Sequence, residues 1–199
     1  MKALGLLLFP TVAIALMLGG TAQAQKVGDN SVYFTTYYSH ANTTGAPDQN
    51  LRIINDGDTG ANLWASLYVF DDSQELQECC SCAVTPDGLT SESVDKNLTS
   101  NSLTTKVNTR GMIKVISSSV AAGGPTNYTN TPTAGLRVWS TQTQRATATS
   151  GAFYVAETQA ADSNLGTSEK WLLENLCLYL NLLGSGQGNC TCTPEDADF

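Results

Sequence analysis

The sequence predicts a mainly β protein: a single-domain β-sandwich, immunoglobulin-like or jelly-roll-like, with one C-terminal α-helix and a tail tied down by disulfides. Three observations predict this fold. Short apolar stretches rich in Val, Ile, Thr and aromatic residues alternate with turns of Gly, Asn, Asp and Ser. One late segment, 168–183, instead has apolar residues at helical spacing. The cysteines lie in two groups that are far apart in the chain.

The first residues have the three parts of a secretory signal peptide. A positively charged start precedes an apolar run at 4–18, and Ala22 and Ala24 supply the small residues before a cleavage site. The predicted organisation is a signal peptide at 1–24 and one disulfide-stapled β domain at 25–199. A retained membrane anchor is the alternative, but the run is shorter than the roughly 20 residues that cross a bilayer. We therefore expect a secreted protein, extracellular or periplasmic, with no membrane span after signal removal.

The net charge of the chain limits the classes of molecule that it is expected to bind. Its formal net charge is −8, and an acidic surface repels phosphate backbones and anionic lipid. The sequence therefore predicts no nucleic-acid partner. A second copy of the chain or a partner on the cell envelope or surface remains the expectation, and no cofactor is predicted.

The apolar stretches predict strands at 32–38, 51–54, 63–70, 91–94, 103–107, 112–117, 136–141 and 153–157. The clearest of these is Leu63–Phe70, in which both alternating rows of side chains are largely apolar. A strand with two apolar faces is covered on both sides, so we expect it at the centre of a sheet. The segment after it, which holds the first cysteine group, is expected to be a loop.

The predicted helix at 168–183 carries two adjacent apolar rows: Leu172, Leu176, Tyr179 and Leu183, and then Leu173, Cys177 and Leu180. Thr167 or Ser168 is expected to cap its start, Glu169 suits its first turn, and Gly184 is expected to end it. A buried pair of strands is the alternative, which the absence of Gly and Pro from the segment disfavours. The apolar surface is wide for a single helix, so part of it is expected to face a partner chain.

The first cysteine group holds Cys79, Cys80 and Cys82, and the second holds Cys177, Cys190 and Cys192. An even count in an exported chain favours disulfides, because the destination is oxidising. A bridge between Cys79 and Cys80 would be strained, and one between Cys190 and Cys192 would close a tight ring. Bridges between the groups are therefore favoured, although the pairing stays open. They would tie the helix and the tail to the loop after the central strand.

Two other uses of the cysteines are weaker. Zinc binding would draw on the C-C-x-C and C-x-C runs, but the C-x₂-C spacing of zinc knuckles is absent. Redox catalysis needs a C-x-x-C pair at a helix start, and the chain has none.

Two segments stand out, the E-C-C-x-C-x-V-T-P-D-G-L run at 78–89 and the C-terminal helix followed by G-S-G-x-G-x-C at 184–190. They resemble a group of exported bacterial proteins with no assigned activity. The L-R-I-I-N segment at 51–55 and the L-R-V-W segment at 136–139 extend the likeness over most of the mature chain. The resemblance implies export and this architecture only, and it carries over no catalytic residue.

Candidate catalytic and ligand-binding residues are few. The single histidine, His40, has no G-x-S-x-G motif to accompany it, so no catalytic residue is predicted. The glycine-rich run at 184–188 follows a helix rather than preceding one, so it is interpreted as a helix stop and not as a phosphate loop. A weak calcium site is possible at the strand-end aspartates, which are Asp56, Asp58, Asp71 and Asp72.

The sequence favours a non-enzymatic exported protein with a structural, adhesive or surface role. This role extends to self-assembly of the chain. A carbohydrate- or calcium-binding extracellular module is the first alternative. A hydrolase that uses a pair of carboxylates is the second.

Overall fold

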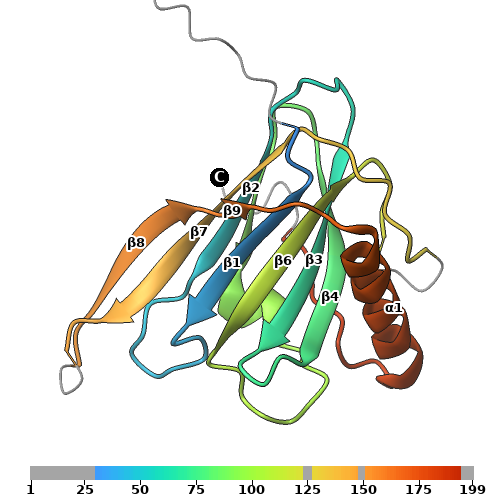
Figure 1. The fold of residues 1–199 in the computed structure, drawn as a ribbon. Coiled ribbons are helices and arrows are strands. Elements are labelled where there is room, and N and C mark those ends of the chain that lie inside the picture. The colour runs from blue at the N-terminus through green and yellow to red at the C-terminus, as the bar shows by residue number, and fades with distance from the viewer. Residues whose placement is uncertain (1–29, 123–126, 148–150, 194–199) are drawn as a thin grey trace, which may run out of the picture.

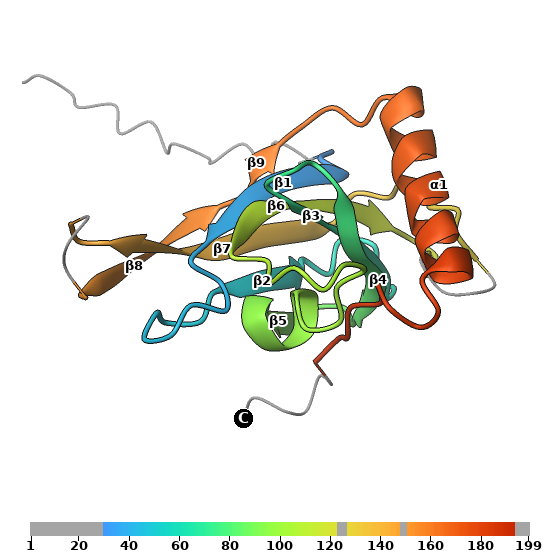
Figure 2. The same cartoon turned by 90° about the horizontal axis from the view of Figure 1, so that it is seen from below.

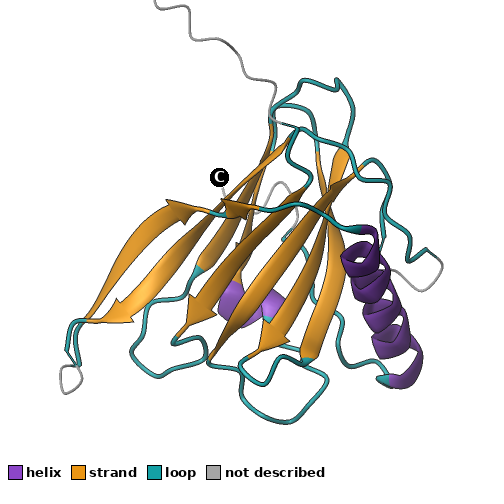
Figure 3. Cartoon of the chain, viewed as in Figure 1, coloured by secondary structure: helices purple, strands orange, loops and turns teal. Residues whose placement is uncertain are grey.

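A computed structural model describes residues 30–122, 127–147 and 151–193, and the predicted signal peptide lies outside these ranges. The chain forms two antiparallel β-sheets with one α-helix against the outside of the first sheet (Figures 1 and 3). This confirms the predicted mainly β sandwich with a C-terminal helix. No helix among the described residues is long and apolar enough to cross a membrane.

The first sheet has the strand order β4 (Leu76–Val84), β3 (Leu63–Asp71), β6 (Arg110–Ser118), β1 (Tyr33–Ser39) and β9 (Ala161–Asp162). The second has the order β5 (Leu89–Ser93), β2 (Asn50–Asn55), β7 (Leu136–Arg145) and β8 (Phe153–Gln159). Every neighbouring pair of these strands is antiparallel. The chain passes from the second sheet to the first between β2 and β3, between β5 and β6, and between β8 and β9.

Two apolar clusters stabilise this arrangement. One lies between the sheets and includes Leu67, Ile53 and Val138. The other lies between the first sheet and the helix and includes Tyr68 and Leu173. Because Leu67 and Tyr68 are consecutive residues of β3, this strand is buried on both faces, as its sequence predicts.

The helix α1 spans Thr167–Leu183 and packs beside β4 (Figure 2). Its predicted N-cap is wrong: Gly166 occupies that position and no side chain caps the helix, because Thr167 and Ser168 already lie in the first turn. Glu169 is in that turn, as expected, and accepts hydrogen bonds from Tyr33 Oη at 2.9 Å and Lys114 Nζ at 2.6 Å. Gly184 ends the helix, as predicted.

Two sequence-based assignments are wrong. The cysteine group 79–82 lies in strand β4 and not in a loop, and the segment 103–107 is a loop and not a strand. Leu103 and Val107 look like strand residues but are 42% and 63% exposed. The structure also adds the short strand β9 and a π-helical turn, η1, at Val94–Leu98. The remaining predicted strands are confirmed with shifts at their ends.

Candidate functional site

Strand β4 is the attachment line for all three disulfides. They join Cys79 to Cys177, Cys80 to Cys190 and Cys82 to Cys192, with Cα–Cα distances of 5.9, 5.3 and 5.5 Å. Successive strand residues point to opposite faces, so Cys80 and Cys82 join the cluster between the sheets while Cys79 joins the cluster under α1. One bridge therefore holds the helix and two hold the tail, which confirms the predicted disulfide-tied tail.

The tail also closes the free edge of β4. The Cys79 amide donates to the Gly188 carbonyl at 2.9 Å, and the Cys190 amide donates to the Cys79 carbonyl at 3.4 Å. Further along the same edge, the Leu103 amide donates to the Gln77 carbonyl at 3.0 Å. An open edge invites pairing with another chain, so the tail and the loop at 99–109 together remove that possibility at β4.

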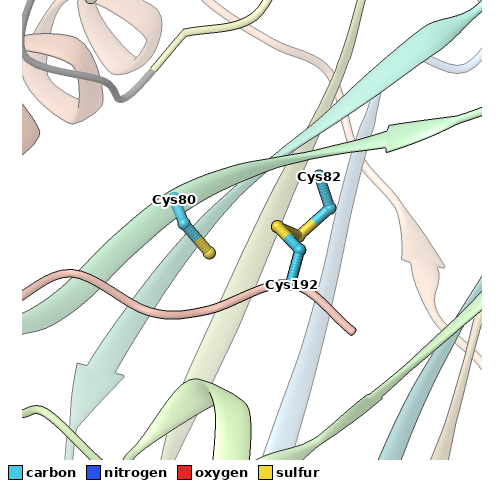
Figure 4. Close-up of side chains that lie close together, drawn as sticks. All are labelled: Cys80, Cys82 and Cys192. Carbon is cyan, nitrogen blue, oxygen red and sulfur yellow. A yellow bond between two sulfur atoms is a disulfide. The ribbon is translucent and has the colours of Figure 1, made fainter. Parts of the chain in front are cut away.

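The cysteines do not offer a metal site in this state. The sulfurs of Cys80, Cys82 and Cys192 lie within 4.8 Å of one another (Figure 4). Zinc binds cysteine as the thiolate, but all six cysteines are in disulfides. The cluster therefore arises from two neighbouring bridges.

A β-bulge in β4 directs two buried polar side chains to the 99–109 loop. Val69 pairs with Glu78 and Phe70 pairs with Leu76, which leaves Gln77 as the extra residue. Gln77 Oε1 accepts hydrogen bonds from the Thr104 amide at 3.2 Å and hydroxyl at 2.9 Å. These bonds fasten the loop to the strand through the Gln77 side chain, in addition to the backbone bond from Leu103.

Glu78 is the second of these side chains and is fully buried. Its Oε1 accepts hydrogen bonds from the Asn101 amide at 2.8 Å and the Ser102 hydroxyl at 3.0 Å, while its Oε2 has no hydrogen-bond partner. Burial raises the pKa of Glu78 to about 7, although the two hydrogen bonds oppose this effect. Sequence reasoning missed Glu78 because its segment was interpreted as a loop.

A cleft of about 820 Å³, whose lining residues are mostly of polar types, lies against the 99–109 loop. Asn42, Asp95, Ser102, Lys106 and Gln187 are among its lining residues. Burial raises the pKa of Asp95, and the hydrogen bond from the Asn42 amide opposes that effect. Asp95 is the only acidic side chain among the described residues that line the cleft, so these residues alone do not supply the carboxylate pair of a glycosidase.

The aspartates proposed for calcium fall into two separate turns. Asp56 and Asp58 precede β3, whereas Asp71 and Asp72 lie at and beyond its other end. The carboxylates of Asp56, Asp71 and Asp72 have side-chain or backbone partners within the protein. Asp56 pairs with Arg137 Nη2 at 2.9 Å, Asp71 accepts from the Ser73 and Glu75 amides, and Asp72 pairs with Lys106 and Arg110. The four residues therefore do not converge on one ion.

The histidine and the glycine-rich run have structural surroundings. His40 Nδ1 lies 3.2 Å from the Thr143 carbonyl, and its ring packs edge-on against Phe153 with centroids 5.4 Å apart. Gly188 lies so close to the helix that a Cβ there would be 1.7 Å from Leu180 Cδ2. The run thus needs glycine to bring the tail against α1 and β4.

Within the part of the chain that the structure describes, the outward face of α1 exposes large apolar side chains. Its large exposed side chains recur at helical spacing: Trp171, Leu172, Tyr179, Leu182 and Leu183. A groove of about 570 Å³ runs between this helix and the 99–109 loop, lined in part by Leu103 and Leu176. Contiguous apolar surface of this kind marks interaction sites in soluble proteins.

Comparisons with known proteins give no family. No protein-family description matches the sequence, and no curated protein matches it. One solved structure, described as the crystal structure of Thermotoga maritima 1070, is similar with a TM-score of 0.42 at 10% identity, over 67% of this chain and 94% of that chain.

Proposed function

We propose that this chain is an exported, non-enzymatic structural or adhesive protein of the cell envelope or surface, and that the outward face of α1 is its attachment surface. The observation that carries the proposal is the exposure of that face: Trp171 is 63% exposed, Leu182 is 65% exposed and Leu183 is 76% exposed. Large apolar side chains gathered on an exposed face of a soluble protein mark an interaction site.

The helix is also held rigidly, as an attachment surface requires. Its inward face packs through Leu173 and Leu180 on the first sheet, and the Cys79–Cys177 bridge ties its middle to β4. Glu169 ties its start to β1 and β6 through Tyr33 and Lys114. A preorganised surface loses less conformational entropy when a partner binds.

Charge on this face is expected to weaken attachment. Leu182→Glu introduces a carboxylate at the centre of the contact, so we expect binding to envelope fractions of the native host to weaken by roughly tenfold or more, since burial of one leucine stabilises by about 1.5–3 kcal/mol. Sedimentation of the purified full chain with these fractions measures the effect.

Asn62→Glu is the matched control, because it adds the same charge at an exposed position in the turn before β3, outside α1. It should bind as the wild-type chain does. Equal binding by Leu182→Glu, or no binding by the wild-type chain, would contradict the proposal.

The polar cleft favours a second candidate function, a module that binds a neutral polar ligand such as a sugar. Under this candidate, a soluble oligosaccharide present at about 100 times its Kd would stabilise the fold by about 2.7 kcal/mol and raise its Tm. Gln187→Leu, which changes a lining side chain, would remove the shift. A panel of oligosaccharides that leaves the Tm unchanged would exclude it.

A further inference from the structure

The four edge strands of this sandwich differ in their length and in how far other segments cover them. The edge of β4 is covered by the tail and the 99–109 loop. The edge strand β5 is contacted by the tail, where Thr193 Oγ1 donates to the Ser91 carbonyl at 3.1 Å and the Thr193 amide donates to Glu92 at 2.8 Å. The edge strand β9 has only two residues. The fourth edge strand, β8, is a full seven residues long.

Strand β8 lacks most of the features that normally protect an edge. The β7–β8 hairpin extends beyond the rest of the sandwich (Figures 1 and 2). Six of the seven residues of β8 are exposed, including Tyr154 and Val155. The strand contains no proline and no lysine, and its pairing with β7 has no bulge.

The alternation of the ladder decides which groups this edge presents. The Ala146 amide donates to the Ala152 carbonyl, and the Ala160 amide donates to the Val138 carbonyl. Even-numbered residues of β8 therefore turn their backbone groups toward β7, because the two directions alternate along an antiparallel strand. The outward N–H and C=O groups belong to the odd-numbered residues: Phe153, Val155, Glu157 and Gln159.

From these features we infer that the chain forms a homodimer by antiparallel pairing of two β8 edges, centred on Ala156. This rests on the proposed function in that it gives a structural protein its mode of self-association, but it uses a different surface from α1. In this register Val155 faces Glu157 of the second copy and Phe153 faces Gln159, so every outward donor meets an acceptor. Ala156 faces Ala156 of the second copy, and these small side chains permit the two strands to approach closely.

The self-complementary register makes a second copy the occupant, and charge permits that copy at this edge although it opposes contact elsewhere. The chain has a net charge of −8, so two copies repel over most of their surfaces. The only charged residue in β8 is Glu157, and it is paired with Arg52 on β2. The edge is therefore locally neutral, and because the contact is the same patch on both copies, it closes as a symmetric dimer.

The decisive experiment uses single cysteines in the full mature chain. Across the proposed dimer, Ala156 meets Ala156 as a non-hydrogen-bonded pair with Cα atoms about 4.5 Å apart, within the range of a disulfide. Ala156→Cys is expected to form a covalent dimer spontaneously. Thr158→Cys is the control, because the two copies of residue 158 lie about 13 Å apart in this register. Intact-mass measurement distinguishes the crosslinked dimer from monomers whose native disulfides have rearranged.

A non-covalent test complements it. Sedimentation velocity from micromolar to millimolar concentration should show a wild-type dimer. Val155→Pro removes an outward N–H that β7 does not use, so it should keep the hairpin and raise the dimer Kd roughly tenfold or more. Val155→Thr retains the N–H and should leave the Kd unchanged.

A wild-type chain that stays monomeric, or equal crosslinking of the two cysteine variants, would overturn the inference. A dimer abolished by Leu182→Glu and untouched by Val155→Pro would place the interface on α1. That result would overturn pairing through β8 and leave the proposed function standing. A wild-type chain that forms the β8 dimer but does not bind envelope fractions would contradict the proposed function and leave pairing through β8 standing.

Discussion

Reduction of the three disulfides is expected to unfold most of the domain at 37 °C. The bridges span sequence separations of 98, 110 and 110. Closing one loop of about 100 residues stabilises by about 4.7 kcal/mol through the entropy of the unfolded chain, and the other two close rings of about 15 residues or fewer, at about 2–3 kcal/mol each. The total of roughly 10 kcal/mol compares with a typical domain stability of 5–15 kcal/mol.

The measurement compares refolding of the oxidised chain with refolding of the reduced and alkylated chain, followed by circular dichroism and urea unfolding. The chain has to be unfolded before reduction, because Cys79, Cys82 and Cys177 are buried. Cys79→Ser with Cys177→Ser is the partial control: it keeps two bridges and is expected to lose only about 3 kcal/mol. An alkylated chain with the urea midpoint of the oxidised one would contradict this account.

Local patterns in the sequence predict much of the fold. The two apolar rows of Leu63–Phe70 predict a strand covered on both sides, and β3 is one. The periodicity of 168–183 predicts α1, and its wide apolar surface agrees with an inward row, Leu173 to Leu180, and an exposed outward face. These features succeed because their cause is local: side-chain direction follows from backbone periodicity.

Strand β4 could not be recognised in this way. Gln77 and Glu78 are polar, and their neighbours are cysteines and a serine, so the segment lacks an apolar pattern. Its burial is compensated by distant residues, with Thr104 bonded to Gln77 and Ser102 bonded to Glu78. Leu103 has the apolar side chain typical of a strand residue, but it lies exposed in the 99–109 loop. The partners that decide these positions are distant in sequence.

Glu78 is expected to make the fold less stable as the pH rises. Its pKa in the folded protein is about 7, above the usual value of 4.5. The folded state therefore holds a proton that the unfolded state releases between these two values, and stability falls as the pH increases through that window. A difference of this size corresponds to about 2–3 kcal/mol between pH 5 and pH 8.

Glu78→Gln removes the titrating group and keeps an oxygen that can accept the bonds from Asn101 and Ser102. The variant should lose about 2–3 kcal/mol of the pH dependence of unfolding between pH 5 and pH 8, as measured by urea unfolding at both values. The absolute stability is a poorer readout, because the new amide needs a hydrogen-bond partner where Oε2 has none.

Glu75→Gln removes the same charge from an exposed turn and should retain the wild-type pH dependence. If both variants keep that dependence, Glu78 is not the group responsible for it; if Glu78→Gln alone loses it, the buried carboxyl beneath the 99–109 loop governs the stability of this strand near neutral pH.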